Sequence, residues 1–343
     1  MKKLLLVILL VSSTAFVFSQ STGNGVFKSL NLPASARIGA LGGNLIAIAD
    51  GDMGLAFFNP ALLDSTMDKR IEMSYLNYFS DINLGSAHFA KHFSHIGTAS
   101  LSLQYLDYGD FTETDVSNNN LGDFQVSDVI VNLGFGRQLD SNFTAGVNLK
   151  YINSALADYT SSGIAADFGL HYYKKKGLFS AALLLKNIGT QLGNYTEGNK
   201  EKLPFEIQAG FTKKLRHAPF RFGFMLENLQ EWDIRRESEK NIVTIDPITE
   251  EIREDKSFVA GDIFMRHLIF NTEVLIGKNI TFRLGYNYRR RQELAFEEKP
   301  GTVGLSIGAA VKVSKFNISY GRSTYHLAGP SNHFTVNTSI SDW

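Results

Sequence analysis

Apolar and polar residues alternate one by one along most of the chain from Ile71 onward. Between Asn142 and Asn153, for example, every second residue from Phe143 to Tyr151 is apolar, and the residues between them are polar or small. Successive side chains of a β-strand point to opposite faces, so each such stretch predicts a strand with one apolar and one polar face. The pattern recurs in about fourteen stretches.

The connections between these expected strands alternate between tight turns and long loops. Asp140-Ser141 and Gly277-Lys278 are tight turns, whereas Leu106–Gln125 and Leu229–Ile263 are long. Outer-membrane barrels have short periplasmic turns and longer outer loops. A soluble β-sandwich would also alternate, but strands of about ten residues with aromatic fringes favour a membrane barrel. The sequence therefore predicts an all-β fold, a transmembrane antiparallel β-barrel of about 14 strands.

Composition narrows the function classes further. The 343 residues carry 34 Lys+Arg and 34 Asp+Glu, so no net charge attracts nucleic acid. The chain has no cysteine, which excludes a disulfide framework, a thiolate metal site and a cysteine nucleophile. The mean hydropathy of -0.08 argues against a helical membrane protein but is compatible with alternating strands.

The N-terminus has the organisation of a secretory signal peptide. Lys2 and Lys3 precede the apolar stretch Leu4–Val11, and Val17-Phe18-Ser19 ends in a small residue before Gln20. The apolar stretch is shorter than the roughly 20 residues that a spanning helix needs. We expect residues 1–19 to be a signal peptide, cleaved after Ser19, and the mature chain to reside in the bacterial outer membrane.

Residues 20–70 lack the alternation and are rich in Ala, Gly and Asn. A barrel of this size has a lumen wider than its own side chains can fill, so this segment is predicted to be a plug of short helices. Asn59-Pro60-Ala61 reads as a helix start, with Asn59 as N-cap and Pro60 at the first helical position. Gly42 and Gly43 suit close backbone approach or positive φ. The barrel is then expected over residues 71–343.

Three motifs in the plug segment carry a family resemblance: Asn-Leu-Pro-Ala-Ser-Ala-Arg at 31–37, Ala-Leu-Gly-Gly at 40–43 and Asn-Pro-Ala at 59–61. With them, the chain resembles the PorV/PorQ family of the type IX secretion system, closest to PorQ, whose barrels are related in shape to FadL. The resemblance implies a non-catalytic outer-membrane anchor for a PorZ-like surface protein. Its complex with PorU and PorV would process secreted cargo and attach it to lipopolysaccharide at the outer-membrane lipid surface.

The longest expected loop, Leu229–Ile263, is also the most charged. A solvated loop is the ordinary interpretation, and docking of a partner protein is the functional one. Our candidate docking residues are Trp232, Arg235, Arg236, Glu250, Glu251 and Arg253.

Two patterns suggest chemistry but are weak. Gly304-Leu305-Ser306-Ile307-Gly308 matches the nucleophile-elbow pattern, which needs a strand-to-helix turn rather than a regular strand. His88 and His92 share one face of an expected strand but stand roughly 13 Å apart. We therefore expect no catalytic residues, no metal site and no cofactor.

The sequence leaves competing functions open. The main hypothesis is the PorQ-like anchor. The alternative is a FadL-like channel for hydrophobic small molecules, which needs a lateral gap at a kinked strand and an apolar pocket between plug and wall, with Leu55, Phe57, Phe58, Leu62 and Leu63 as its candidate lining. An outer-membrane enzyme ranks last. Mixed charges on the polar strand faces could staple the plug or form a conduit, and they suit packing better.

Overall fold

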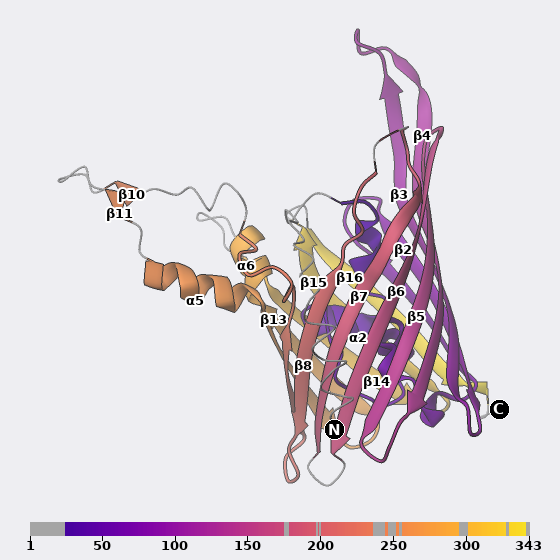
Figure 1. The fold of residues 1–343 in the computed structure, drawn as a ribbon, viewed down its shortest axis with the longest axis vertical. Coiled ribbons are helices and arrows are strands. Elements are labelled where there is room, and N and C mark those ends of the chain that lie inside the picture. The colour runs from indigo at the N-terminus through magenta and orange to yellow at the C-terminus, as the bar shows by residue number, and fades with distance from the viewer. Residues whose placement is uncertain are drawn as a thin grey trace, which may run out of the picture.

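In the computed structural model, the described residues are 25–174, 178–196, 198, 200–235, 244–245, 252–253, 256–294, 301–326 and 329–340. Within them, 14 antiparallel strands form a closed barrel, which confirms the predicted fold class (Figure 1). Neighbouring strands in the sequence pair with each other, β9 pairs with β12, and β1 pairs with β16 to close the wall. The predicted signal peptide, residues 1–19, lies outside the described residues.

The barrel strands are β1 (Arg70–Asn77), β2 (Asn83–Phe93), β3 (Gly97–Thr114), β4 (Asn120–Gln138), β5 (Phe143–Leu156), β6 (Tyr159–Lys174), β7 (Phe179–Gly193), β8 (Glu206–Lys214), β9 (Phe220–Leu226), β12 (Leu268–Ile276), β13 (Ile280–Asn287), β14 (Leu305–Val313), β15 (Phe316–His326) and β16 (Gly329–Ser339). A separate two-stranded sheet consists of β10 (Thr244–Ile245) and β11 (Ile252–Arg253).

The alternation of the sequence separates an apolar outer surface from a polar inner one. Leu133 and Leu149 are exposed on the outside of the wall, whereas their neighbours Asn132 and Asn148 are buried inside it. Leu133 pairs with Leu149 across β4 and β5, and the apolar outer face continues around the other strands. This surface is the lipid-facing band of an outer-membrane barrel.

The lipid-facing band gives a first prediction. Leu133 is 56% exposed near the middle of the β4 segment that pairs with β5, and Leu139 is 62% exposed at the turn that follows β4. We expect Leu133→Arg to lower the free energy of unfolding in bilayers by about 2–4 kcal/mol, and Leu139→Arg by about 0–1 kcal/mol. Urea unfolding in lipid vesicles measures both. Equal costs at the two depths would contradict a membrane position for this band.

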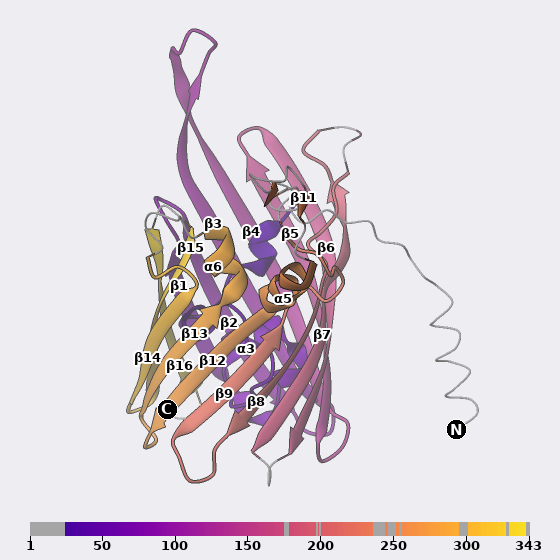
Figure 2. The ribbon, with the colours of Figure 1, turned by 90° about the vertical axis from the view of Figure 1, so that its left-hand side faces the viewer.

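In the described part of the chain, five short helices precede the barrel strands; α2 lies inside the barrel in Figure 1, and α3 lies inside it in Figure 2. They are η1 (Lys28–Asn31), α2 (Ala36–Ala40), α3 (Met53–Phe58), η2 (Pro60–Leu62) and η3 (Ser65–Met67). Most residues of α2, α3 and η2 have almost no exposed surface, because the wall surrounds them. We refer to residues Val26–Met67 as the plug. No helix in the described part of the chain is long and apolar enough to cross a membrane.

The outer rim differs from the expected loops. Leu106–Gln125, expected as a long loop, is instead the upper part of a long β3–β4 hairpin. The sequence pattern also predicts a long loop at Ser154–Ser162, and that segment is largely strand. Strands that leave the membrane continue to pair because their backbone groups still need partners. Two helices flank the β12–β13 hairpin: α5 (Lys256–Arg266) precedes β12, and α6 (Tyr288–Leu294) follows β13. The alternation of the sequence predicts strands over Phe264–Ile276 and Asn279–Arg290, but the first of these segments begins within α5 and the second ends within α6.

Candidate functional site: the plug and its seats in the barrel wall

Local capping starts each of the main plug helices. The Asp52 side chain accepts a hydrogen bond from Leu55 N at 3.1 Å at the start of α3. At the start of η2, Asn59 Oδ1 accepts from Ala61 N at 3.0 Å, and Pro60 occupies the first turn. These side chains satisfy backbone N–H groups that a helix leaves unpaired.

Asn59 also joins two parts of the plug. It is fully buried, and its Nδ2 donates to Ile46 O at 2.8 Å. Asn148 on β5 donates to Phe57 O at 2.8 Å, so the preceding helix is held by the wall as well. The Asn-Pro-Ala motif is therefore the point at which α3, η2 and the returning chain at Ile46 are fixed together.

The wall carries a glycine seat under this motif, formed by Gly136, Gly146 and Gly169 on β4, β5 and β6. A Cβ placed on Gly146 would lie 2.6 Å from Ala61 N, and one on Gly136 would lie 2.7 Å from Pro60 O. A Cβ on Gly169 would overlap Asn59 Oδ1. At Gly136 and Gly146 the contacts are with plug backbone, which cannot move aside as a flexible side chain can, so only glycine permits this approach.

A second glycine seat lies under helix α2 and consists of Gly285, Gly308 and Gly321 on β13, β14 and β15. A Cβ on Gly285 would lie 2.8 Å from Leu41 Cα, and one on Gly308 would lie 2.5 Å from Ala40 Cβ. A Cβ on Gly321 would meet the carbonyl group of Ala36. Helix α2 is thus packed directly against the backbone of the wall.

Gly42 and Gly43 end α2 with the positive φ values of 91° and 93°. Gly43 N donates to Ile38 O at 2.9 Å, which closes the helix. A side chain at Gly42 would also meet Ile269 of β12, and one at Gly43 would meet Arg290. The chain therefore reverses at a place that offers no room for a Cβ.

A group of paired charges, the ionic lock (Arg37, Asp50, Arg221, Glu273 and Arg283), ties the plug to the wall. Arg37, Glu273 and Arg283 are buried, whereas Asp50 and Arg221 are partly exposed. Arg37 of α2 donates to Asp50 at 2.7 and 2.8 Å and to Glu273 of β12 at 2.9 Å through two nitrogens. Arg221 of β9 donates to Asp50 at 2.9 Å and to Glu273 at 2.8 Å. Arg283 of β13 donates to Glu273 at 3.2 Å. Paired charges of this kind make strong, geometrically specific hydrogen bonds.

The lock has a defined pH dependence at Asp50, which lies in the plug. Burial alone would raise the pKa of Asp50, but the guanidinium groups of Arg37 and Arg221 outweigh burial and hold this pKa well below its ordinary value. Because the folded-state pKa is lowered, the stabilisation is fully present above the ordinary pKa of about 4 and is lost as the pH falls through the folded-state pKa.

We expect Asp50→Asn to lower the melting temperature by an amount that stays constant from about pH 7 to about pH 5 and shrinks only in stronger acid. Thermal unfolding in detergent across this range, beside the wild type, measures the difference. A difference that disappears near about pH 6 would contradict the lock.

A further buried ion pair stands where β7 bulges. Lys150 Nζ lies 2.6 Å from Asp167 Oδ2 and donates to Asn187 Oδ1 at 3.0 Å. Asp167 also accepts from Asn187 N at 2.8 Å, because the β6–β7 register shifts at this point. Lys186 of β7 lies over the Phe58 ring at 4.3 Å from its centroid. Lys150 and Asp167 therefore neutralise each other inside the wall, and Lys186 contacts the plug through Phe58. Both arrangements help to hold the plug in the lumen.

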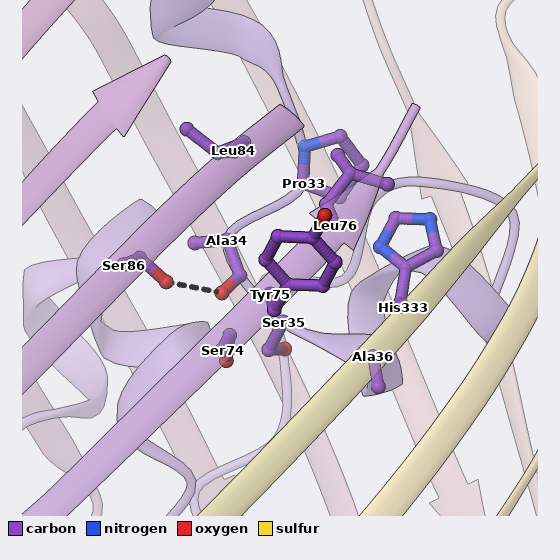
Figure 3. Close-up of a pocket in the computed structure, with 10 residues that line it drawn as sticks. All are labelled: Pro33, Ala34, Ser35, Ala36, Ser74, Tyr75, Leu76, Leu84, Ser86 and His333. Carbon is purple, nitrogen blue, oxygen red and sulfur yellow. Dashed lines mark hydrogen bonds between the residues drawn. The ribbon is translucent and has the colours of Figure 1, made fainter. Parts of the chain in front are cut away.

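Two described cavities border the plug. One lies between Pro33–Ala36 and strands β1, β2 and β16 (Figure 3) and is too narrow to hold a water molecule; there Ser86 Oγ donates to Ala34 O at 3.1 Å. The other, of about 70 Å³, is lined by Ile48, Ala49, Tyr173, Leu178, Ser180, Thr212, Lys214 and Arg221. Neither includes the five apolar plug residues considered for a channel. Leu55, Phe57, Phe58, Leu62 and Leu63 are instead packed in buried clusters.

The structure describes part of the predicted docking set. Trp232 is 62% exposed and stacks on His267 at 5.6 Å, and Arg235 pairs with Asp233 at 2.8 Å. Arg253 belongs to β11, of which only the backbone is described. Arg236, Glu250 and Glu251 lie outside the described residues. The docking set as a whole therefore stays a prediction.

The structure also shows where the nucleophile-elbow pattern and the histidines lie. Ser306 is buried in β14, which continues as a strand, and Gly304 lies in the turn before it. His92 Nδ1 lies 2.9 Å from Thr98 Oγ1. Across the described ranges, no three His, Asp or Glu residues are grouped in a way that could hold a metal ion.

The sequence predicts that mixed charges on the polar strand faces staple the plug, but it reveals neither the glycine seats nor the pairing of Arg37 with Glu273 in the ionic lock. The seat glycines occupy inward positions of alternating strands and read simply as small residues on the polar face. Arg37 and Glu273 are 236 residues apart, and nothing local connects them. The one sequence feature that could have predicted the seats is the presence of glycines at inward positions of adjacent strands.

Comparison with known proteins gives likeness in structure alone. No protein-family description and no curated protein matches the sequence. The Pseudomonas putida toluene transporter TodX is 10% identical, with a TM-score of 0.52 over 89% of this chain and 96% of TodX. A Pseudomonas aeruginosa FadL homologue is 10% identical, with a TM-score of 0.48 over 89% of this chain and 97% of its own.

The monoaromatic hydrocarbon channel CymD is 11% identical, with a TM-score of 0.47 over 90% of this chain and 96% of CymD. At such identities a likeness carries the fold and not the substrate. The likeness to TodX together with the apolar outer band places the chain among outer-membrane β-barrels of FadL-like fold.

Proposed function

We propose that this chain is a non-catalytic outer-membrane anchor of the PorQ type, which holds a PorZ-like surface protein in the attachment complex of a type IX secretion system. The observation that carries the proposal is the plug, which is held by two glycine seats and an ionic lock. A lumen filled in this way favours a scaffold over an open pore. The three plug motifs that resemble the PorV/PorQ family lie at the seats and the lock.

The plug residues of these motifs have structural roles in the proposal. Arg37 belongs to the lock, Gly42 and Gly43 end α2, and Asn59-Pro60-Ala61 rests on the first glycine seat. A fixed plug makes the barrel a rigid support, and the outer rim is then free to hold a partner. The exposed Trp232 and its neighbours remain our candidate docking loop.

The alternative function is a FadL-like channel for hydrophobic small molecules. It is supported by the likeness to TodX, which is described as a toluene transporter, and by the apolar plug clusters. Those clusters would have to open before a small molecule could pass, because Leu55 and Phe57 are buried against other plug and wall residues.

Deletion of the gene separates the two functions. The anchor function predicts that a surface protein of the attachment complex is lost from the outer face of the cell and that secreted cargo is released unattached. Restoration of the full chain should reverse both effects. Unchanged surface attachment, combined with slower uptake of hydrophobic compounds, would refute the anchor function and support the channel.

A further inference from the structure

The hairpin of β3 and β4 extends beyond the rest of the barrel on the outer side (Figure 1). β2 pairs with β3 only as far as Asp107, and β5 pairs with β4 only as far as Val126. From Asp110 to Phe124 the two strands pair only with each other in the described structure, and Gln125 O also accepts a hydrogen bond from Ala157 N at 3.3 Å. We call residues 110–125 the hairpin tip; both of its outer edges present backbone N–H and C=O groups without a neighbouring strand.

The hairpin tip is apolar in places where no described part of the protein covers it. Phe111 and Phe124 face each other across the two strands with ring centroids 5.5 Å apart, and Phe111 is 42% exposed. Val116 and Leu121 are exposed as well. A two-stranded hairpin alone is marginally stable in water, so a third strand along one edge would add pairing and cover this apolar surface.

The charge of the hairpin restricts what can bind there. Residues 107–125 contain five acidic residues and no Lys, Arg or His: Asp107, Asp110, Glu113, Asp115 and Asp123. Asp110 and Asp123 accept hydrogen bonds from Gln125 and Thr112, so their charges remain uncompensated by a cation. A second copy of the hairpin and the phosphates of lipopolysaccharide would both be repelled.

We propose that the hairpin tip docks a basic, extended segment of the surface partner protein, which adds a strand to one free edge. Backbone pairing would provide affinity, and Lys or Arg side chains of the partner would meet the acidic residues. The identity of this occupant rests on the proposed anchor function. The tip favours a strand as its ligand because it presents free strand edges rather than a concave pocket.

A defined peptide tests the inference. The chain has no cysteine, so Ser117→Cys in the exposed turn of the tip gives one attachment point for a fluorescent dye on the full protein in lipid nanodiscs. The probes are a Lys-Val alternating peptide of about ten residues, a Glu-Val peptide of equal length, and a Lys-Val peptide N-methylated at alternate residues.

We expect the Lys-Val peptide to bind at least about tenfold more tightly than either other peptide. The triple variant Asp110→Asn, Glu113→Gln, Asp123→Asn should lose about tenfold in affinity for it. Equal binding of the acidic peptide would overturn the charge argument, and equal binding of the N-methylated peptide would overturn strand addition.

Replacing residues 110–125 by a short turn, with the dye attached at Asp81→Cys in both proteins, should abolish binding. Unchanged binding would refute the inference. A surface partner that the wild type and this deletion variant recover equally from membranes would also refute it and leave the anchor function standing. Failure of both to recover a partner would refute the anchor function itself, while the peptide result would still decide whether the tip accepts a basic strand.

Discussion

Gly146→Ala is expected to unseat the plug, although it adds only one methyl group. The added Cβ would lie 2.6 Å from Ala61 N and still closer to the carbonyl group of Pro60, so plug backbone must shift. Overpacking of a tight interior costs about 1–3 kcal/mol. Displacement of Pro60 also strains the Asn59 hydrogen bonds that hold α3 and η2 together. Thermal unfolding and hydrogen exchange of residues 52–63 should both report the change.

Gly85 is the matched control. It lies in barrel strand β2, and a Cβ placed on it meets no atom within 4 Å. Gly85→Ala should therefore leave the melting temperature and plug exchange unchanged. If Gly146→Ala and Gly85→Ala behave alike, the first glycine seat does not fix the plug.

Arg37→Ala is expected to have the largest electrostatic effect. Removal of one partner from a buried ion pair costs about 3–5 kcal/mol, because it leaves charge buried without compensation. Asp50 and Glu273 would keep Arg221, and Glu273 would also keep Arg283, so the lower end of this range applies. Chemical unfolding in detergent measures the loss.

Two comparisons isolate the lock from a general loss of charge. Arg235→Ala breaks a more exposed pair with Asp233 and should cost at most about 1 kcal/mol. A double-mutant cycle of Arg37→Ala and Glu273→Gln should give a coupling energy of about 0.5–3 kcal/mol. Independent effects of the two substitutions would show that the plug is not held through this pair.

The part of the fold inside the membrane could be predicted from sequence because lipid and lumen impose opposite polarity on successive residues. The stretch Phe143–Tyr151 shows this alternation, and it forms part of strand β5 as predicted. Outside the membrane the constraint ends. Tyr288 continues the apolar alternation of Ile280–Tyr286, yet the chain turns there into α6, whose backbone groups find their hydrogen-bond partners within the helix.

For the site, too, contacts between residues close in sequence could be predicted, and contacts between distant residues could not. Capping by Asn59 could be predicted, because its acceptor and the Ala61 N–H are two residues apart. The contact of Asn59 with Gly169 depends on which strands border the plug, and the sequence pattern does not contain that information. The sequence likewise places Glu273 among the charges that could staple the plug, but its pairing with Arg37 follows only from the closure of the barrel.

A fixed, plugged barrel that holds a surface protein should co-purify with that protein. Affinity purification of the full chain from mildly solubilised outer membranes, with mass spectrometry of both proteins and bound small molecules, measures this. We expect a surface protein in nearly equal amount to the barrel and no bound hydrophobic compound inside it. Recovery of the barrel alone, with a hydrophobic ligand bound between plug and wall, would contradict the anchor function.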